Sequence, residues 1–163
     1  MTVDDYEHIA AEIGTRLSAN MAGGGFLAAR GPNDEKMVIA IQKVQNLTND
    51  IMSEPTRWYL MARVRDSLPV GSLSREKNVA FVIPAERLRQ ARQRGMLREE
   101  DAPMDRRPTH VMSATFRSVT RSTGRERTDL YYCDYAITDL GSGEVVWTDK
   151  VEFKRAASGR TWD

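Results

Sequence analysis

The sequence predicts a single α/β domain with a mixed sheet, in which a parallel βαβ unit joins an antiparallel three-stranded meander and helices pack on the sheet. Two short, continuous apolar runs, Met37–Ile41 and Val79–Ile83, flank a segment with helical periodicity. Residues 109–154 instead alternate apolar and polar side chains, which is the pattern of strands with one buried face. A length of 163 residues is typical of one domain, so residues 1–163 are assigned to a single unit.

The first predicted element is an amphipathic helix over Thr2–Met21. Apolar residues recur there at i, i+4, which predicts one buried stripe formed by Ile9, Ile13, Leu17 and Met21. Three glycines, Gly23–Gly25, follow and end the helix. A glycine run can cradle a phosphate group, but no Gly-Lys-Ser/Thr follows this one, so we interpret it as a helix end.

The βαβ unit is predicted from the next segments. Met37–Ile41 is apolar at every position, as expected of a central strand that is covered on both faces. A helix begins at Glu54-Pro55 and ends before Gly71, with a stripe formed by Leu60, Val64 and Leu68. Val79–Ile83 is the second strand, and this strand–helix–strand spacing predicts a right-handed connection between two central parallel strands.

A third helix is predicted from Pro84 to Gly95, with a narrow apolar side. Its polar side is basic and carries Arg87, Arg89, Arg92 and Arg94. The simpler interpretation is a solvated face, because a surface helix needs a polar side. The alternative is a patch for an anion or an acidic partner, which the acidic run Glu99–Asp101 partly offsets.

The meander follows a proline-bearing loop. Its strands share an apolar side on which Asp149 is the one break, formed by Met112, Ala114, Phe116, Tyr131, Cys133, Tyr135, Ile137, Val145, Trp147, Val151 and Phe153. Glycine-bearing turns are predicted at Ser122–Arg125 and Leu140–Gly143. The apolar side needs a cover, and we expect the helices of the earlier chain to supply it.

The sequence offers no pattern for catalysis, for a cofactor or for a metal. The only cysteine, Cys133, excludes an internal disulfide, and its mid-strand position predicts a buried, inert thiol. The two histidines, His8 and His110, lack the spacing of a zinc motif. No pair of carboxylates is distinguished as general acid and base. We therefore predict that the protein is not an enzyme, with a small enzyme built from scattered residues as an open alternative.

Charge and hydropathy restrict the possible partners and cellular locations of the protein only in part. The net charge of +1 indicates no particular partner. The apolar runs have the length of strands, far below the roughly 20 residues of a membrane span. The N-terminal residues lack a basic segment, an apolar run and a cleavage site, so we predict no signal peptide in this chain. The protein is then either cytoplasmic or preceded by a removed signal.

Arginines cluster where the first hairpin of the meander bends, at Arg117, Arg121, Arg125 and Arg127. We predict that this hairpin binds a partner, because protruding guanidinium groups suit an acidic protein surface or a polyanion. The simpler alternative is that hairpin tips are polar for local reasons. Few aromatic residues alternate with these arginines, so nucleic acid is not an expected partner.

Two segments resemble a known family. Val38–Asn49 (VIAIQKVQNLTN) resembles the first strand and the Asn-x-Thr exit of the LpoB-type activators of penicillin-binding proteins. Ser142–Asp149 (SGEVVWTD) is similar to a Thr-Gly-Glu-Ile-Ile-Trp-Ser hairpin in the same family. The predicted order of elements also agrees, and the resemblance extends over roughly Asp4–Lys154. It implies a domain like the N-terminal domain of TolB, which the secretion lipoprotein CsgG shares.

The resemblance also implies a function. It implies a non-catalytic outer-membrane lipoprotein that faces the periplasm, binds no cofactor, and docks on a bifunctional penicillin-binding protein to stimulate peptidoglycan synthesis for the cell wall and cell shape. A lipobox cysteine and a long proline-rich tether are not present, so membrane attachment would require a lipid anchor absent from this chain. The alternative is a CsgG-like secretion or envelope-assembly subunit, although the arginine-bearing hairpin lacks a lipid-facing apolar row. The oligomeric state and the role of the tail Arg155–Asp163 stay open.

Overall fold

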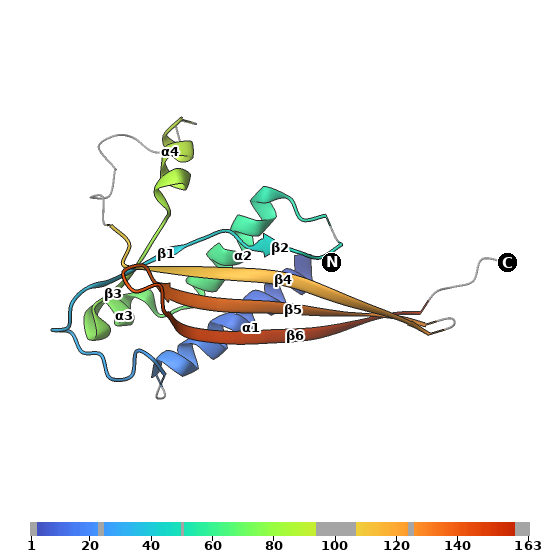
Figure 1. The fold of residues 1–163 in the computed structure, drawn as a ribbon, viewed down its shortest axis with the longest axis horizontal. Coiled ribbons are helices and arrows are strands. Elements are labelled where there is room, and N and C mark those ends of the chain that lie inside the picture. The colour runs from blue at the N-terminus through green and yellow to red at the C-terminus, as the bar shows by residue number, and fades with distance from the viewer. Residues whose placement is uncertain (1–2, 23–24, 50, 94–106, 124–125, 159–163) are drawn as a thin grey trace.

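The computed structural model describes residues 3–22, 25–49, 51–93, 107–123 and 126–158 (Figure 1). Its elements in chain order are α1 (Val3–Ala22), β1 (Met37–Ile41), β2 (Gln45–Asn46), α2 (Glu54–Asp66), α3 (Val70–Lys77), β3 (Val79–Val82), α4 (Ala85–Gln93), β4 (His110–Thr123), β5 (Glu126–Asp139) and β6 (Val145–Ser158). The predicted mixed α/β architecture is confirmed.

The strands form one sheet in the order β3-β1-β4-β5-β6, and the short β2 pairs with β4. β1 runs parallel to both β3 and β4, whereas β4, β5 and β6 form the predicted antiparallel meander. All five residues of Met37–Ile41 are buried, as expected of a central strand. The prediction of two central parallel strands is wrong for the second one. β3 is an edge strand, because the chain returns through α4 to the other side of β1.

Helices α1, α2 and α3 lie behind the sheet in the view of Figure 1 and cover its apolar face. The stripe predicted on the first helix is buried at Ile9, Ile13 and Leu17. It packs with Val64 of α2 and with the inward side chains of the meander in one core. The side chain of Met21 lies outside the described part of the chain.

The segment between β1 and β3 holds two helices where the sequence predicted one. α2 ends at Asp66 and α3 begins at Val70, so Gly71 lies inside α3 and not past a helix end. Pro69 explains the break, because it has no N–H to donate to the carbonyl group four residues earlier. α3 ends at Lys77 and is capped by Asn78, which has the left-handed φ of 51°.

The meander is longer than predicted at its far end. β4 runs to Thr123 and β6 runs through Arg155 to Ser158, so the tail begins later than expected. Ser122 and Thr123 of the turn predicted at Ser122–Arg125 belong to β4, and its residues 124–125 lie outside the described residues. In the turn at Leu140–Gly143, the Asp139 carboxylate accepts hydrogen bonds from the backbone N–H groups of residues 141 and 142, at 2.6 and 3.1 Å.

The prediction that Val145 lies on the apolar side of the meander is wrong, because 55% of its surface is exposed. The register of β5 with β6 shifts at this point: Thr138 pairs with Val145, whereas Ile137 pairs with Trp147. One extra residue in β6 forms a bulge, so Val145 and Trp147 face opposite sides of the sheet. Trp147 and Val151 are buried as predicted.

Candidate functional site

The thiol group of Cys133 has a structural role. Cys133 lies on the core side of β5, where burial raises its pKa to about 12. A thiol with this pKa is protonated at neutral pH and is therefore a poor nucleophile. Its neighbour on the same face, Tyr135, is buried beside it, and burial raises the pKa of its hydroxyl group well above the usual range.

His110 links the start of β4 to the strands on either side. Its Nδ1 atom lies 2.8 Å from the Thr109 hydroxyl oxygen, which in turn accepts a hydrogen bond from the Val38 backbone N–H. Its Nε2 atom lies 3.6 Å from the carboxylate of Asp139. Burial, together with the charge of Arg30, lowers the pKa of His110, although the Asp139 carboxylate opposes this shift. The imidazole therefore lies between the Thr109 hydroxyl group and the Asp139 carboxylate at this end of the sheet.

His8 stands apart from His110, exposed on α1 with its Nε2 atom 4.0 Å from the Glu12 carboxylate. Across the described ranges, no group of three or more His, Cys, Asp or Glu side chains could hold a metal ion. The two histidines and Cys133 are thus distributed over separate parts of the structure.

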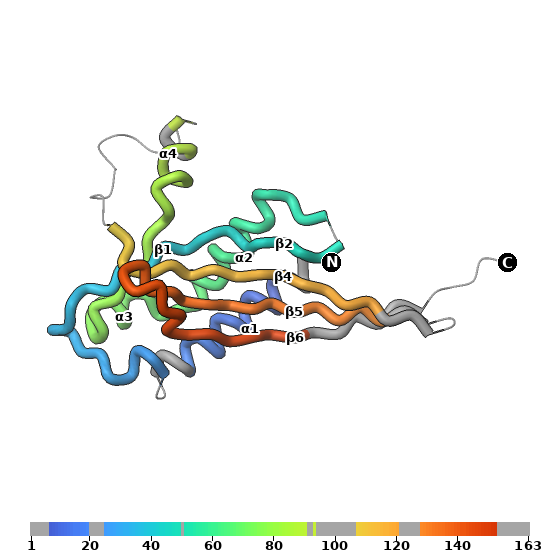
Figure 2. Tube along the Cα trace, viewed as in Figure 1, coloured from blue at the N-terminus to red at the C-terminus, as the bar shows by residue number. Residues whose placement is uncertain are grey.

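The distal halves of β4, β5 and β6 form an arm that extends beyond the helices (Figure 1). The three strands lie side by side over the coloured part of the trace in Figure 2, and their pairing continues to Thr123, Glu126 and Ser158. Its core-side register changes from apolar to polar: Phe116 is fully buried, whereas the Thr120 hydroxyl group donates a 2.6 Å hydrogen bond to the carboxylate of Asp129. On the other side of β4, 48% of Val119 is exposed. At Thr120 the arm is therefore polar and exposed on the side where the rest of the sheet has its apolar core.

The four predicted docking arginines are only partly placed. Arg117 lies on the outer face of the arm, with its Nε atom 3.7 Å from the Asp134 carboxylate, and its side chain is 59% exposed. Arg121 and Arg127 belong to β4 and β5 and pair in register with Thr128 and Ser122, but their side chains lie outside the described residues. Arg125 lies outside the described residues altogether.

Further charges continue across the outer face beside Arg117. The Lys150 ammonium group pairs with Glu152 and lies 5.3 Å from the centre of the Tyr132 ring. The hydrogen bond and the charge of Glu152 raise the pKa of Lys150. These groups are solvated, so their pairs contribute little to stability and leave the charges available to a partner.

A groove that the sequence did not predict opens at the carboxyl ends of β1 and β3. It has a volume of about 370 Å³ and is lined by Ile41, Pro55, Trp58, Tyr59, Met61, Ala62, Arg65, Phe81, Val82, Ile83, Pro84 and Arg87. These residues come from four elements and from the segment that joins β3 to α4. The sequence features that belong to this groove are two adjacent aromatic residues in α2 and the arginines of α4. They indicate a groove only once the strand order shows that α2 and α4 lie at the same end of the sheet.

The motif segments have structural roles. The Asn46 side-chain oxygen accepts hydrogen bonds from the backbone N–H and the hydroxyl group of Thr48, at 3.1 and 2.8 Å. The turn after β5 brings the backbone N–H of Gly143 to the carbonyl oxygen of Asp139, at 2.9 Å. Trp147 is buried and lies beside Phe26, with 6.4 Å between the ring centres.

Comparisons with solved structures give similarities at low identity. The LpoB C-terminal domain from Escherichia coli is 15% identical, with a TM-score of 0.48, and the match covers 91% of this chain and 98% of that domain. The LpoB C-terminal domain from Salmonella enterica is 14% identical, with a TM-score of 0.47 and the same coverage. A lipoprotein from Neisseria meningitidis is 13% identical, with a TM-score of 0.45, over 77% of this chain and 87% of that one. At these sequence identities and TM-scores the similarity concerns the fold alone and does not indicate the function.

No family model matches the sequence, and no curated protein does. Among the described helices, none has the length and apolar character that crossing a membrane requires.

Proposed function

We propose that this domain is a non-catalytic binding module of the bacterial envelope that docks on a bifunctional penicillin-binding protein and stimulates its synthesis of peptidoglycan. In this proposal the domain works in the periplasm and is tethered to the outer membrane by a lipid anchor outside this chain. The support comes from Val38–Asn49 and Ser142–Asp149, which resemble the corresponding segments of LpoB-type activators.

The observation that carries the proposal is that the two segments pair with β4 and β5, two of the strands that lead into the arm. The first segment pairs with the middle of β4, where the Leu47 backbone N–H donates a 2.8 Å hydrogen bond to the carbonyl oxygen of Phe116. The second segment pairs with β5, where Trp147 lies opposite Ile137. The segments thus fix the direction in which the arm leaves the body.

The arm is the surface that we propose for docking. The Arg117 side chain is exposed on this surface. Arg121, Arg125 and Arg127 follow it in the sequence. Arginine is suited to this role because its planar guanidinium group binds carboxylates with two parallel hydrogen bonds. An acidic surface on the synthase would meet these charges first, so they would affect mainly the rate of association.

The test uses the purified domain and the purified bifunctional penicillin-binding proteins of the same organism. We expect the domain to bind one of these synthases and to raise the rate at which it polymerises the lipid-linked precursor. The triple variant Arg117→Glu, Arg121→Glu, Arg125→Glu should slow association strongly at low salt and less at high salt. For a control matched in charge, Arg117→Glu alone is compared with Arg75→Glu, an exposed reversal of one charge on α3.

Two results would count against the proposal. Binding to none of these synthases would remove the function itself. Binding and stimulation that the triple variant leaves unchanged at low salt would retain the function but exclude the arm as the docking surface.

A further inference from the structure

The groove lies at the point where the strand order reverses, because β3 and β4 are added on opposite sides of β1. β1 leads through α2 and α3 to β3 on one side, and β3 leads through α4 to β4 on the other side of β1. The connections after β1 and β3 therefore diverge, and α4 stands away from the other helices in Figure 1. In open α/β sheets, such a reversal leaves a crevice outside the carboxyl ends of the strands, and ligands bind there.

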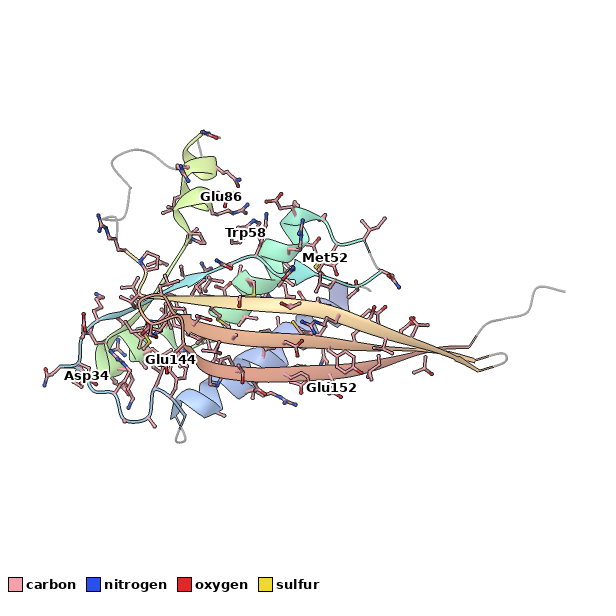
Figure 3. All side chains as sticks on the ribbon, in the orientation of Figure 1. Asp34, Met52, Trp58, Glu86, Glu144 and Glu152 are labelled. Atoms are coloured by element: carbon pink, nitrogen blue, oxygen red, sulfur yellow. The ribbon has the colours of Figure 1, made fainter. Side chains whose placement is uncertain are left out.

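The interior of this groove is apolar and aromatic. Ile41 and Phe81 come from the ends of β1 and β3, and Met61 comes from α2. Trp58 lies on the side of α2 that faces α4 (Figure 3), and the guanidinium carbon of Arg87 lies 5.0 Å from the centre of its ring. A volume of about 370 Å³ is enough for one or two apolar side chains and falls in the usual range of binding pockets.

The open edge of the sheet borders the same groove. In the part of the chain that the structure describes, β3 pairs with β1 alone. The Met37 backbone N–H bonds to the carbonyl oxygen of Asn78, and Ile39 lies opposite Phe81 in the parallel register. Main-chain groups alternate in direction along a strand, so those of Phe81 point away from β1 towards the open edge. An open edge can pair with a further extended segment.

The helices that border the groove are basic. α2 and α4 together contain six arginines and three carboxylates, namely Glu54, Asp66 and Glu86. Two of these carboxylates are already paired, Glu54 with Lys43 at 3.2 Å and Asp66 with Arg65 at 2.7 Å. Arg87 contacts the Trp58 ring and has no carboxylate partner among the described residues. Within the described residues, the groove therefore presents the positive charge of Arg87 beside an apolar interior.

We propose that this groove binds an extended, acidic segment of a partner protein, which pairs with the open edge of β3. The segment inserts an apolar side chain between Trp58 and Phe81 and brings a carboxylate to Arg87. The edge requires an extended backbone, the interior requires an apolar side chain, and the guanidinium group of Arg87 favours a negative charge. The inference does not depend on the partner being a peptidoglycan synthase.

The experiment begins with selection from a combinatorial library of short peptides against the intact domain. Enriched peptides are synthesised, and their dissociation constants are measured by fluorescence anisotropy. We expect enriched sequences to alternate apolar and other residues and to carry Asp or Glu. Arg87→Glu should weaken their binding about tenfold or more, whereas Arg75→Glu should leave it within about twofold. Circular dichroism of both variants verifies that they are folded.

Backbone pairing is tested separately by methylating the peptide nitrogen atoms one at a time. A segment added to a sheet edge directs alternate N–H groups towards the edge, so methylation should abolish binding at every second position only. Failure to enrich any peptide, enrichment without acidic residues, or equal tolerance of methylation at all positions would each overturn the proposal. Saturable binding of decanoate in place of peptides would assign the groove to a small amphiphile. Self-association that Arg87→Glu abolishes would assign it to a second copy of the chain.

Discussion

The contact between α1 and α2 gives a prediction whose sign can be reversed. Gly14 is buried in α1, and a Cβ atom added there would lie 1.7 Å from the Ser67 hydroxyl oxygen and 2.5 Å from the Ser67 Cβ atom. The hydroxyl group can rotate away only by losing its 2.7 Å hydrogen bond to the carbonyl oxygen of Val64, and the Cβ atom cannot rotate away. Gly14→Ala therefore forces α1 and α2 apart.

The magnitude follows from two opposing effects. In an unhindered helix, replacing Gly by Ala stabilises by roughly 0.5–1 kcal/mol. Inserting a methyl group into a packed interior costs about 1–3 kcal/mol, and the 2.5 Å contact favours the upper end of that range. We therefore expect Gly14→Ala to lower the free energy of unfolding by about 1–2 kcal/mol. For a chain of this length, the melting temperature would fall by roughly 2–8 °C.

The same substitution should stabilise a protein that already carries Ser67→Gly. That change removes both clashing atoms and leaves the Cα atom of residue 67 as the nearest neighbour, at an ordinary contact distance of 3.7 Å. Gly14→Ala should then raise the free energy of unfolding by about 0.5–1 kcal/mol, the value for a free helix. In the control background Ser67→Ala, the Cβ atom remains, so Gly14→Ala should stay destabilising.

The measurement is urea unfolding followed by far-UV circular dichroism for the four proteins of the double-mutant cycle and the Ser67→Ala pair. The reasoning would be refuted if Gly14→Ala raised the unfolding midpoint in the unmodified protein. An effect of equal size and sign in all three backgrounds would refute it as well.

The remaining predictions concern the core and the candidate sites. Cys133 should not react with Ellman's reagent at pH 8 in the folded protein, because its pKa is raised to about 12, and should react at once in urea; fast native labelling would contradict its burial. The lowered pKa of His110 means that the unfolded state binds its proton first, so this residue's contribution to stability should be complete above about pH 6.5 and decline as the pH falls below that value. His110→Gln should reduce the pH dependence of the free energy of unfolding measured by urea titration. An unchanged pH dependence would show that another group causes it. Asn46→Ala should lower the free energy of unfolding by about 1–2 kcal/mol through loss of the Thr48 turn, while the salt dependence of partner association stays unchanged; an altered salt dependence would indicate a docking role. Phe116→Ala should lower the free energy of unfolding by about 3–5 kcal/mol, whereas Val119→Ala on the exposed side of the arm should change it by less than about 0.5 kcal/mol. Similar decreases for both variants in thermal unfolding would show that Val119 is covered.

The candidate docking surfaces differ in how far sequence could identify them. The arginine cluster is a local pattern, so its members could be named from the hairpin alone, although the structure describes the side chain of Arg117 only. The groove could not be found in this way. It joins Ile41 to Arg87 through α2 and β3, and it exists because the chain reverses its direction across the sheet. That reversal is set by packing between distant segments and leaves no periodic signal.

The fold class, most of the elements and most of the buried faces could be predicted from the sequence, because these depend on periodicity within a few residues. Alternation correctly predicted that Met112, Cys133 and Ile137 would be buried. The position of β3 at the edge became clear from the strand order, because its four apolar residues suit a central strand equally well. The exposure of Val145 likewise depends on a bulge in the pairing of β5 with β6. A strand's neighbours are chosen by contacts far along the chain, and local pattern does not encode them.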